Sequence, residues 1–163
     1  MTTRFAGLAS AAFLALALSL SSSAATRAGD MSAAEGIVKV KSAYSLDESV
    51  TRLKADIASK GIMFFTAVDQ SKLAADAGIT LRPSTLLIFG NPPLGTQFMT
   101  SNPDSGLDWP VRLLVYQDAA GQVWAVYNDF AWIAARHGIK DRDAQFKMAA
   151  TVIASITSSV AAK

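Results

Sequence analysis

Two stretches of the chain, residues 46–57 and 146–160, carry apolar side chains on one helical face. In both stretches the apolar residues recur at steps of three and four, which is the spacing of an amphipathic helix. These positions are Leu46, Val50, Leu53 and Ile57 in the first stretch and Phe146, Ala149, Ile153, Ile156 and Val160 in the second. Because such a helix has to pack its apolar face on another layer, the chain must supply a flat partner for two helices.

Several short segments between and before these helices carry strand patterns. In residues 36–42, Val38 and Val40 alternate with lysines, as in a strand with one buried face. Ile62 to Val68 is an almost continuous apolar run, which favours a central strand. Further strand patterns are residues 83–89, 111–116 and 122–128, and the last two are joined by a glycine-containing connection typical of a hairpin.

Local signals predict where the helices begin and end. Ser45 and Glu48 have the spacing of a capping box at the start of the first long helix. Asp69, Asn91 and Asp141 are each expected to cap a later helix. The other expectations are an inward-facing Leu73 and Ala77, a loop over residues 103–110 and a short helix over residues 130–136.

The order of these elements predicts a two-layer α+β fold: strand, helix, four strands and helix, with small inserted helices and a mainly antiparallel sheet. Phe65, Leu87 and Trp124 can each lie on either face of that sheet. Since the helices cover one face, the other must be solvated, covered by a lid or paired with another chain. This uncovered face is the main indication of function.

The first 25 residues have the features of an export signal. Arg4 precedes an apolar run over residues 5–20, and small residues follow up to Ala25, after which we expect cleavage, with a cut after Ala24 or Ala28 as the alternatives. The run is shorter than the roughly 20 residues that a membrane-spanning helix needs. We therefore expect an exported protein, periplasmic or secreted, without a stable membrane anchor after cleavage. Residues 26–35 are expected to form a flexible leader and residues 36–163 a single domain.

Composition and charge exclude several classes of function. The net charge is only +2 and the basic residues are scattered, so nothing favours binding to nucleic acid. The chain has no cysteine, which excludes disulfides, thiolate nucleophiles and cysteine-ligated metals. With one histidine and no calcium-loop pattern, we expect neither a metal site nor a cofactor.

Four segments occur in an order and at a spacing that resemble the family catalogued as domain of unknown function 302. They are Leu81–Thr96, which contains "FGNP", Gly106–Asp118, Gly121–Asp129, which contains "YND", and Ala135–Gly138. The likeness spans roughly Lys39 to Ile156 and implies a fold like that of the TATA-box-binding protein. It implies no settled activity. Many members carry a histidine after the second strand, whereas this chain has Gln70, so no role of that histidine transfers.

The candidate ligand-binding residues lie around the predicted strand ends. Asn91 opens a helix directly after a strand, and the adjacent small residues allow a ligand to approach the backbone. If the start of the third strand meets the end of the last one, their polar residues form one rim. The candidates are Arg82, Asn91, Gly95, Thr96, Trp124, Tyr127, Asn128 and Asp129.

These residues favour a non-catalytic accessory protein that binds a small apolar or amphiphilic ligand or associates with itself as a homodimer. The alternative is a hydrolase-type enzyme in which Asp129 and His137 act as acid and base, with Ser84 as the nucleophile of an imagined triad. No nucleophile-elbow motif supports that reading. A third alternative is a structural partner of another envelope protein.

Overall fold

The structure, a computed structural model, describes residues 36–162. The expected signal peptide and leader, residues 1–35, lie outside this range. The elements are β1 (Ile37–Lys41), α2 (Leu46–Ser59), β2 (Met63–Asp69), α3 (Gln70–Asp76), β3 (Ser84–Gly90), α4 (Pro92–Ser101), the 3-10 helix η1 (Pro103–Leu107), β4 (Val111–Gln117), β5 (Val123–Asn128), α5 (Phe130–Arg136) and α6 (Asp143–Ser158).

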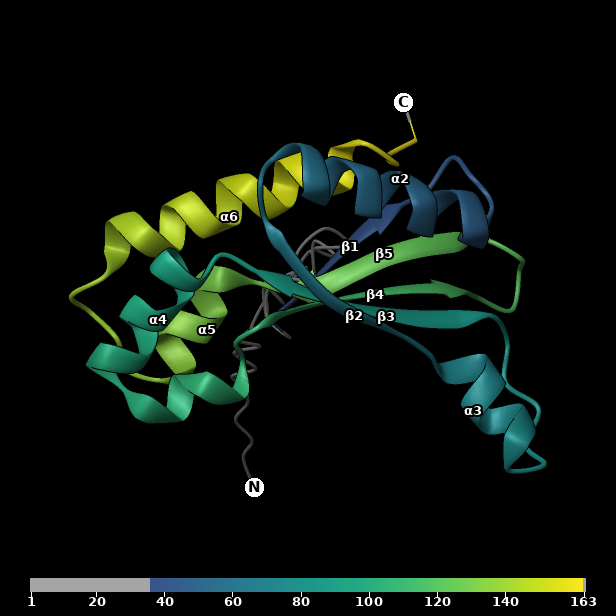
Figure 1. Cartoon of the computed structure of the whole chain (residues 1–163), viewed down its shortest axis with the longest axis horizontal. Coiled ribbons are helices and arrows are strands. Elements are labelled where there is room, and N and C mark those ends of the chain that lie inside the picture. Colours follow the sequence, from purple (N-terminus) through teal and green to yellow (C-terminus); the bar gives the residue numbers. More distant parts are fainter. Residues whose placement is uncertain (1–35, 163) are drawn as a thin grey trace, which may run out of the picture.

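The strands of this range form one antiparallel sheet in the order β1-β5-β4-β3-β2. Helices α2 and α6 lie on one face of it, α4 and α5 gather at one end, and α3 projects at the other end, away from α2 and α6 (Figure 1). The predicted α+β order and antiparallel sheet are confirmed. The buried core consists of apolar residues of the sheet and of α2, α4, α5 and α6.

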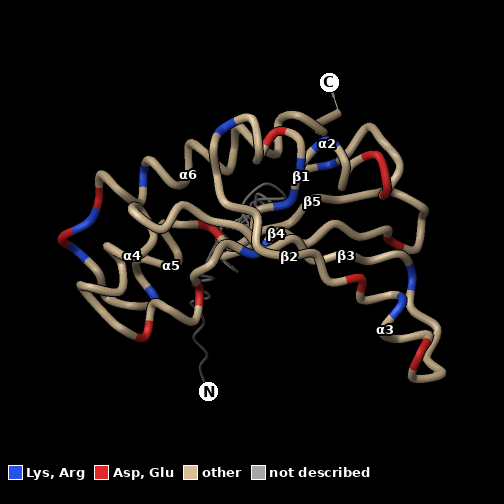
Figure 2. The backbone as a smooth tube through the Cα atoms, viewed as in Figure 1, with Lys and Arg blue, Asp and Glu red and all other residues tan. Residues whose placement is uncertain are grey.

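The alternation along the strands decides which side chains meet the helices. Leu113 and Val115 in β4 are fully buried on the covered face. Leu114 between them points to the opposite, open face, where it is half-buried. In the register of the sheet Leu114 stands beside Leu86 of β3 and Val126 of β5. The open face therefore carries an apolar row across the three inner strands, which hold almost no charge (Figure 2).

Strand β2 is an edge strand, so the expected central position is wrong. Its aromatic residues pack elsewhere than in a sheet interior: Phe64 lies against the core, and Phe65 contacts Trp109 edge-on with ring centroids 6.0 Å apart. The register shifts between Phe64 and Thr66, as in a β-bulge, which breaks the regular alternation. No residue of β2 is fully buried, and Met63 and Phe65 are 52% and 45% exposed, so an apolar run can belong to an edge strand that stays largely exposed.

Three local expectations also need correction. Leu73 is 58% exposed and Ala77 is exposed as well, because α3 projects from the sheet and buries none of its residues. Asp141 does not cap α6; its carboxylate pairs with Arg142, which occupies the N-cap position without a side-chain capping bond. The expected loop over residues 103–110 contains η1. The caps at Ser45, Asp69 and Asn91 are confirmed by hydrogen bonds to the third following backbone N–H.

Candidate functional site

The predicted site residues separate to opposite ends of the sheet. Because β3 and β5 both run antiparallel to β4, they run parallel to each other, and their starts lie at the same end. Arg82 precedes β3, so it lies at the end where Trp124 begins β5, far from the end of β5 at Asn128. The expected single rim is therefore wrong. We refer below to the Arg82 end and the Asn91 end of the sheet.

At the Arg82 end a groove of about 650 Å³ runs along the open face. One wall is the segment between α3 and β3, and the floor comes from the outward-facing side chains of β4. The lining residues are Thr80, Leu81, Arg82, Pro83, Ser84, Leu114, Tyr116, Gln117 and Asp118. The groove has the volume of a small-molecule site, and its lining mixes the apolar Leu81, Pro83 and Leu114 with polar side chains.

The two charged residues that line this groove, Asp118 and Arg82, differ in the hydrogen bonds that they make. Asp118 accepts hydrogen bonds from the backbone N–H groups of Ala120 and Gln122 and, at 2.8 Å, from the indole Nε1 of Trp124. The Trp124 bond, followed by that of Gln122, holds the pKa of Asp118 below its usual 3.8. Arg82 is exposed and forms no hydrogen bond or ion pair with any residue from 36 to 162.

A second cation stands beside the aromatic residues of the same face. The Lys39 Nζ lies 5.7 Å from the ring centroid of Tyr116 and 5.9 Å from that of Trp124. These distances are typical of cation–π contacts. The Arg82 end thus combines a lysine held over aromatic rings, the apolar Leu114 side chain and a guanidinium that makes no hydrogen bond but whose charge contributes to the lowered pKa of Asp118.

At the Asn91 end the most buried charge is Asp108, whose side chain is 1% exposed. His137 Nε2 lies 2.7 Å from its Oδ2, and Arg136 and Arg112 donate to the carboxylate at 3.1 to 3.3 Å. Asn128 Nδ2 lies 3.5 Å from Oδ1. Asp108 joins the start of β4 to the ends of β5 and α5, and such multiple bonding is what a buried carboxylate requires.

Trp109 closes the open face at this end. By strand alternation Gly90 falls on the same face as Leu86 and Ile88, and the Trp109 indole covers it. A Cβ atom at Gly90 would lie 2.0 Å from the indole, and one at Gly95 of α4 would lie 1.4 Å from Nε1. The indole therefore fits only because both neighbours are glycine.

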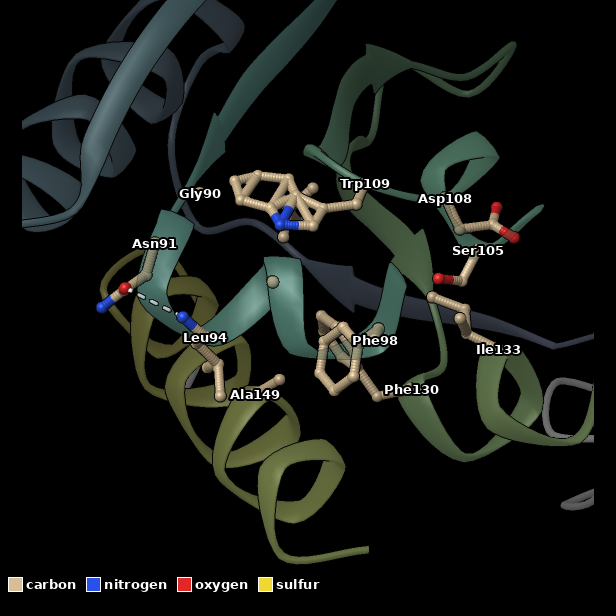
Figure 3. A pocket seen from close by; sticks show the side chains of 12 residues that line it. Gly90, Asn91, Leu94, Phe98, Ser105, Asp108, Trp109, Phe130, Ile133 and Ala149 are labelled. Atoms are coloured by element: carbon tan, nitrogen blue, oxygen red, sulfur yellow. Dashed lines mark hydrogen bonds between the residues drawn. The ribbon is translucent and has the colours of Figure 1, made fainter. Parts of the chain in front are cut away.

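A small pocket of about 40 Å³ lies between Trp109, α4, α5 and α6. Figure 3 shows the indole over α4, with Ser105 and Asp108 to one side and the Asp108 carboxylate turned away. Ser105 and Trp109 are among the residues that line this pocket, and the buried Ser105 Oγ and Trp109 Nε1 have no hydrogen-bond partner among the described residues. The rest of the lining is almost entirely apolar.

The structure gives several predicted residues local roles. Asn91 and Asp129 cap α4 and α5, and the Thr96 hydroxyl donates to the carbonyl oxygen of Pro92. Tyr127 points to the covered face, where it packs against the core and burial raises its pKa. Gly95 supplies part of the seat for Trp109.

The residues of the imagined triad do not meet. Ser84 Oγ donates to Gln70, Asp129 accepts from the backbone of Trp132, and His137 bonds to Asp108. The sequence alone does not identify Asp108 or Ser105 as site residues, because no local motif marks them. Asp108 meets Asn128 and His137 only in the folded chain. Trp109 was visible only as one member of an aromatic-rich region.

Residues 36–162 contain no group of three or more histidine, cysteine or acidic residues that could hold a metal ion. No helix in that range is both long and apolar enough to cross a membrane.

Relatives of the chain are found among curated proteins and solved structures. Over 104 residues it is 43% identical to proteins named "Fluoride-specific ion channel FluC 1" from Brucella suis and Brucella abortus. The match covers 64% of this chain but only 41% and 38% of those relatives, so the chain spans about two-fifths of their length.

A solved structure shares the fold. The crystal structure of an uncharacterised conserved DUF302 protein from Bacillus stearothermophilus superposes with a TM-score of 0.70 at 15% identity. It covers 77% of this chain and 98% of its own. The family described as "Domain of unknown function DUF302" matches residues 38–159, which confirms the predicted resemblance. The chain with the sheet, groove and pocket described above therefore belongs to the DUF302 family.

Proposed function

We propose that this domain is a non-catalytic, exported accessory protein that binds a small amphiphile in the groove at the Arg82 end of the open sheet face. The observation that carries the proposal is the coexistence there of about 650 Å³ of open volume and a guanidinium that makes no hydrogen bond or salt bridge to the described residues. Ligand sites in proteins commonly occupy roughly 300–1,000 Å³ and combine an apolar lining with few polar groups.

The groove chemistry favours an anionic head group on an apolar body. Arg82 can donate two parallel hydrogen bonds to a carboxylate, whereas the Asp118 oxygens already accept three bonds. The apolar body would lie on Leu114 and Leu81, and the latter is 48% exposed. The ligand class is thus a carboxylate with an aliphatic or aromatic tail.

The export part of the proposal rests on the sequence of the first 25 residues alone. Arg4, the apolar run and the small residues before Thr26 predict a cleaved signal. Expression in a bacterium with separate envelope fractions should give a protein whose intact mass corresponds to a chain that begins at Thr26. A full-length product in the cytoplasm would contradict it. Fluoride transport belongs to the name of longer relatives and forms no part of this proposal.

Calorimetric titration with decanoate and with 1-decanol tests the ligand class. Arg82→Gln should weaken decanoate binding by about three- to tenfold, the effect of one exposed charge-assisted bond, and leave 1-decanol binding unchanged. Leu114→Ser should weaken both. Arg142→Gln is the matched control, because Arg142 lies at the start of α6 and pairs with Asp141.

Three outcomes would contradict the proposal. If Arg82→Gln leaves decanoate binding unchanged, Arg82 does not bind the carboxylate head group. Equal affinity for decanoate and 1-decanol would mean that the groove binds the apolar tail without recognising the carboxylate head group. Sedimentation that shows a dimer whose disruption by Leu114→Ser leaves decanoate binding unchanged would assign the open face to self-association instead.

A further inference from the structure

The pocket at the Asn91 end contains two polar groups that the fold leaves without partners. Ser105 is 2% exposed, yet its hydroxyl bonds to nothing among residues 36–162, and the same holds for the buried Trp109 Nε1. Buried donors without acceptors cost free energy, and native proteins contain few of them. Two such groups on one pocket indicate an occupant that completes them.

The pocket has room for a short chain and not for a ring system. Its volume is about 40 Å³, and an adjoining apolar cavity of about 40 Å³ shares Leu94, Val111 and Phe130 with it. A single water needs roughly 10–15 Å³ on the same kind of measure. The second cavity is lined by aliphatic and aromatic side chains, so it suits the tail of a molecule whose polar end stays at Ser105.

The occupant should be uncharged. Asp108 borders the pocket, but its oxygens already accept from Arg112, Arg136 and His137. An ammonium group would find no free acceptor of opposite charge there, and an anion would be desolvated with only two neutral donors. The indole N–H requires an acceptor, whereas the serine hydroxyl can donate or accept.

We infer that this pocket binds a short-chain alcohol, aldehyde or ketone, whose oxygen bonds to the Ser105 hydroxyl and the Trp109 Nε1 and whose chain enters the adjoining cavity. The inference is independent of the amphiphile groove, because the two sites lie at opposite ends of the sheet.

Proton–nitrogen correlation NMR can follow the occupant directly, because the chain has three tryptophans and hence three indole N–H signals. Titration with 2-butanone and with 1-butanol should move the Trp109 signal, assigned through Trp109→Phe, in a saturable way. The Trp124 signal should stay in place, since that N–H already donates to Asp118 at 2.8 Å. From ethanol to 1-butanol the affinity should rise about fourfold per methylene.

Ser105→Ala should weaken 2-butanone binding about five- to tenfold, the effect of one hydrogen bond. The variant should fold, because it removes a hydroxyl that makes no bond within residues 36–162. Ser101→Ala is the matched control, as its hydroxyl donates to Asp141 outside the pocket.

Several results would overturn the inference. A linear, non-saturating shift would show solvent effects only. Equal binding to wild type and Ser105→Ala, or a response to xenon without one to 2-butanone, would leave an apolar void. A saturable shift of Trp109 with sodium fluoride or chloride alone would assign the site to an anion. A crystal soaked in 1-butanol that holds only ordered water at Ser105 would make the two groups a water site.

Discussion

Trp109 and Trp124 lie at opposite ends of the open sheet face and differ in how their indole N–H groups are satisfied. Trp124 Nε1 donates at 2.8 Å to Asp118 in a hairpin turn, beside the open groove. Trp109 Nε1 has no partner among the described residues, and its ring sits on two glycines over a small pocket. One end of the face is therefore held by polar bonds and left accessible, and the other is sealed by packing.

The difference shows how the fold divides its stability. The Asn91 end carries the buried Asp108 carboxylate and the arginine and histidine side chains that pair with it, together with the packing among α4, α5 and α6. At the Arg82 end α3 buries no residue, and Leu73, Ile79 and Leu81 are all exposed. Regions with few buried contacts open most easily, and binding surfaces are commonly found there. Substitutions at the two ends should separate stability from binding.

The largest effect is expected from Asp108→Ala. It removes the acceptor shared by His137 and the two arginines, and the His137 side chain is 5% exposed and has little access to water. Arg112 and Arg136 are 45% and 43% exposed and can turn to solvent, which limits the loss. We expect the free energy of unfolding to fall by about 2–4 kcal/mol, measured by urea denaturation.

Asp104→Ala is the control for this substitution. Asp104 lies in η1, which ends directly before Asp108, but it is exposed, so its replacement should change stability by less than about 0.5 kcal/mol. If both substitutions lower the free energy of unfolding equally, the hydrogen bonds of Asp108 do not contribute specifically to the stability of this end.

A smaller loss is expected from Gly95→Ala, which tests the seat of Trp109. Alanine in a helix would normally gain about 1 kcal/mol over glycine. Here the new methyl group would lie 1.4 Å from Trp109 Nε1, so the ring has to move, and we expect a net loss of about 1–3 kcal/mol.

Gly106→Ala is the matched control for the glycine seat. Its methyl group would lie 3.2 Å from the flexible Met99 Sδ and should be accommodated. Trp109→Leu should cancel most of the Gly95→Ala effect, because a smaller side chain leaves room. Additive losses in the double variant would mean that the two residues are not coupled.

The two layers and the strand order along the chain were predictable, because they follow from local periodicity. The steps of Leu53 and Ile57 on α2 and of Ile153 and Ile156 on α6 identify the helix faces that are buried. Capping residues such as Asn91 bond to backbone groups only a few positions away, so they can be recognised from the sequence alone. The edge position of β2 was not predictable, since it depends on which strands pair, and Phe65 stays 45% exposed although the run is apolar.

The site was less predictable because it depends on which strand ends meet. The sequence identifies Arg82 and Trp124 as candidates but groups Arg82 with Asn128, and only the register reveals that Arg82 lies near Asp118 and Trp124. Asp108 gains its importance from His137 and Arg136 in another segment, and neither neighbour is signalled by local sequence. Long-range pairing of this kind leaves no periodic pattern.

The smallest effect concerns pH and sharpens the contrast between the two tryptophans. Ionised Asp118 is favoured in the folded state, mainly by the Trp124 indole, which holds its pKa below 3.8. The corresponding stability is fully present above pH 3.8 and is lost as the pH falls through the lower folded-state pKa. Asp118→Asn should therefore lower the urea midpoint slightly at neutral pH, and the difference from wild type should shrink in acid.

The indole signals give the same test at each end of the face. As acid protonates Asp118, the Trp124 N–H loses its charged acceptor, so its proton signal should move upfield. The Trp109 N–H bonds to no titrating group among residues 36–162, so its signal should hold through the same range. A Trp109 signal that followed Asp118 would couple the two ends across the sheet, and the division between a sealed end and an accessible end would then not hold.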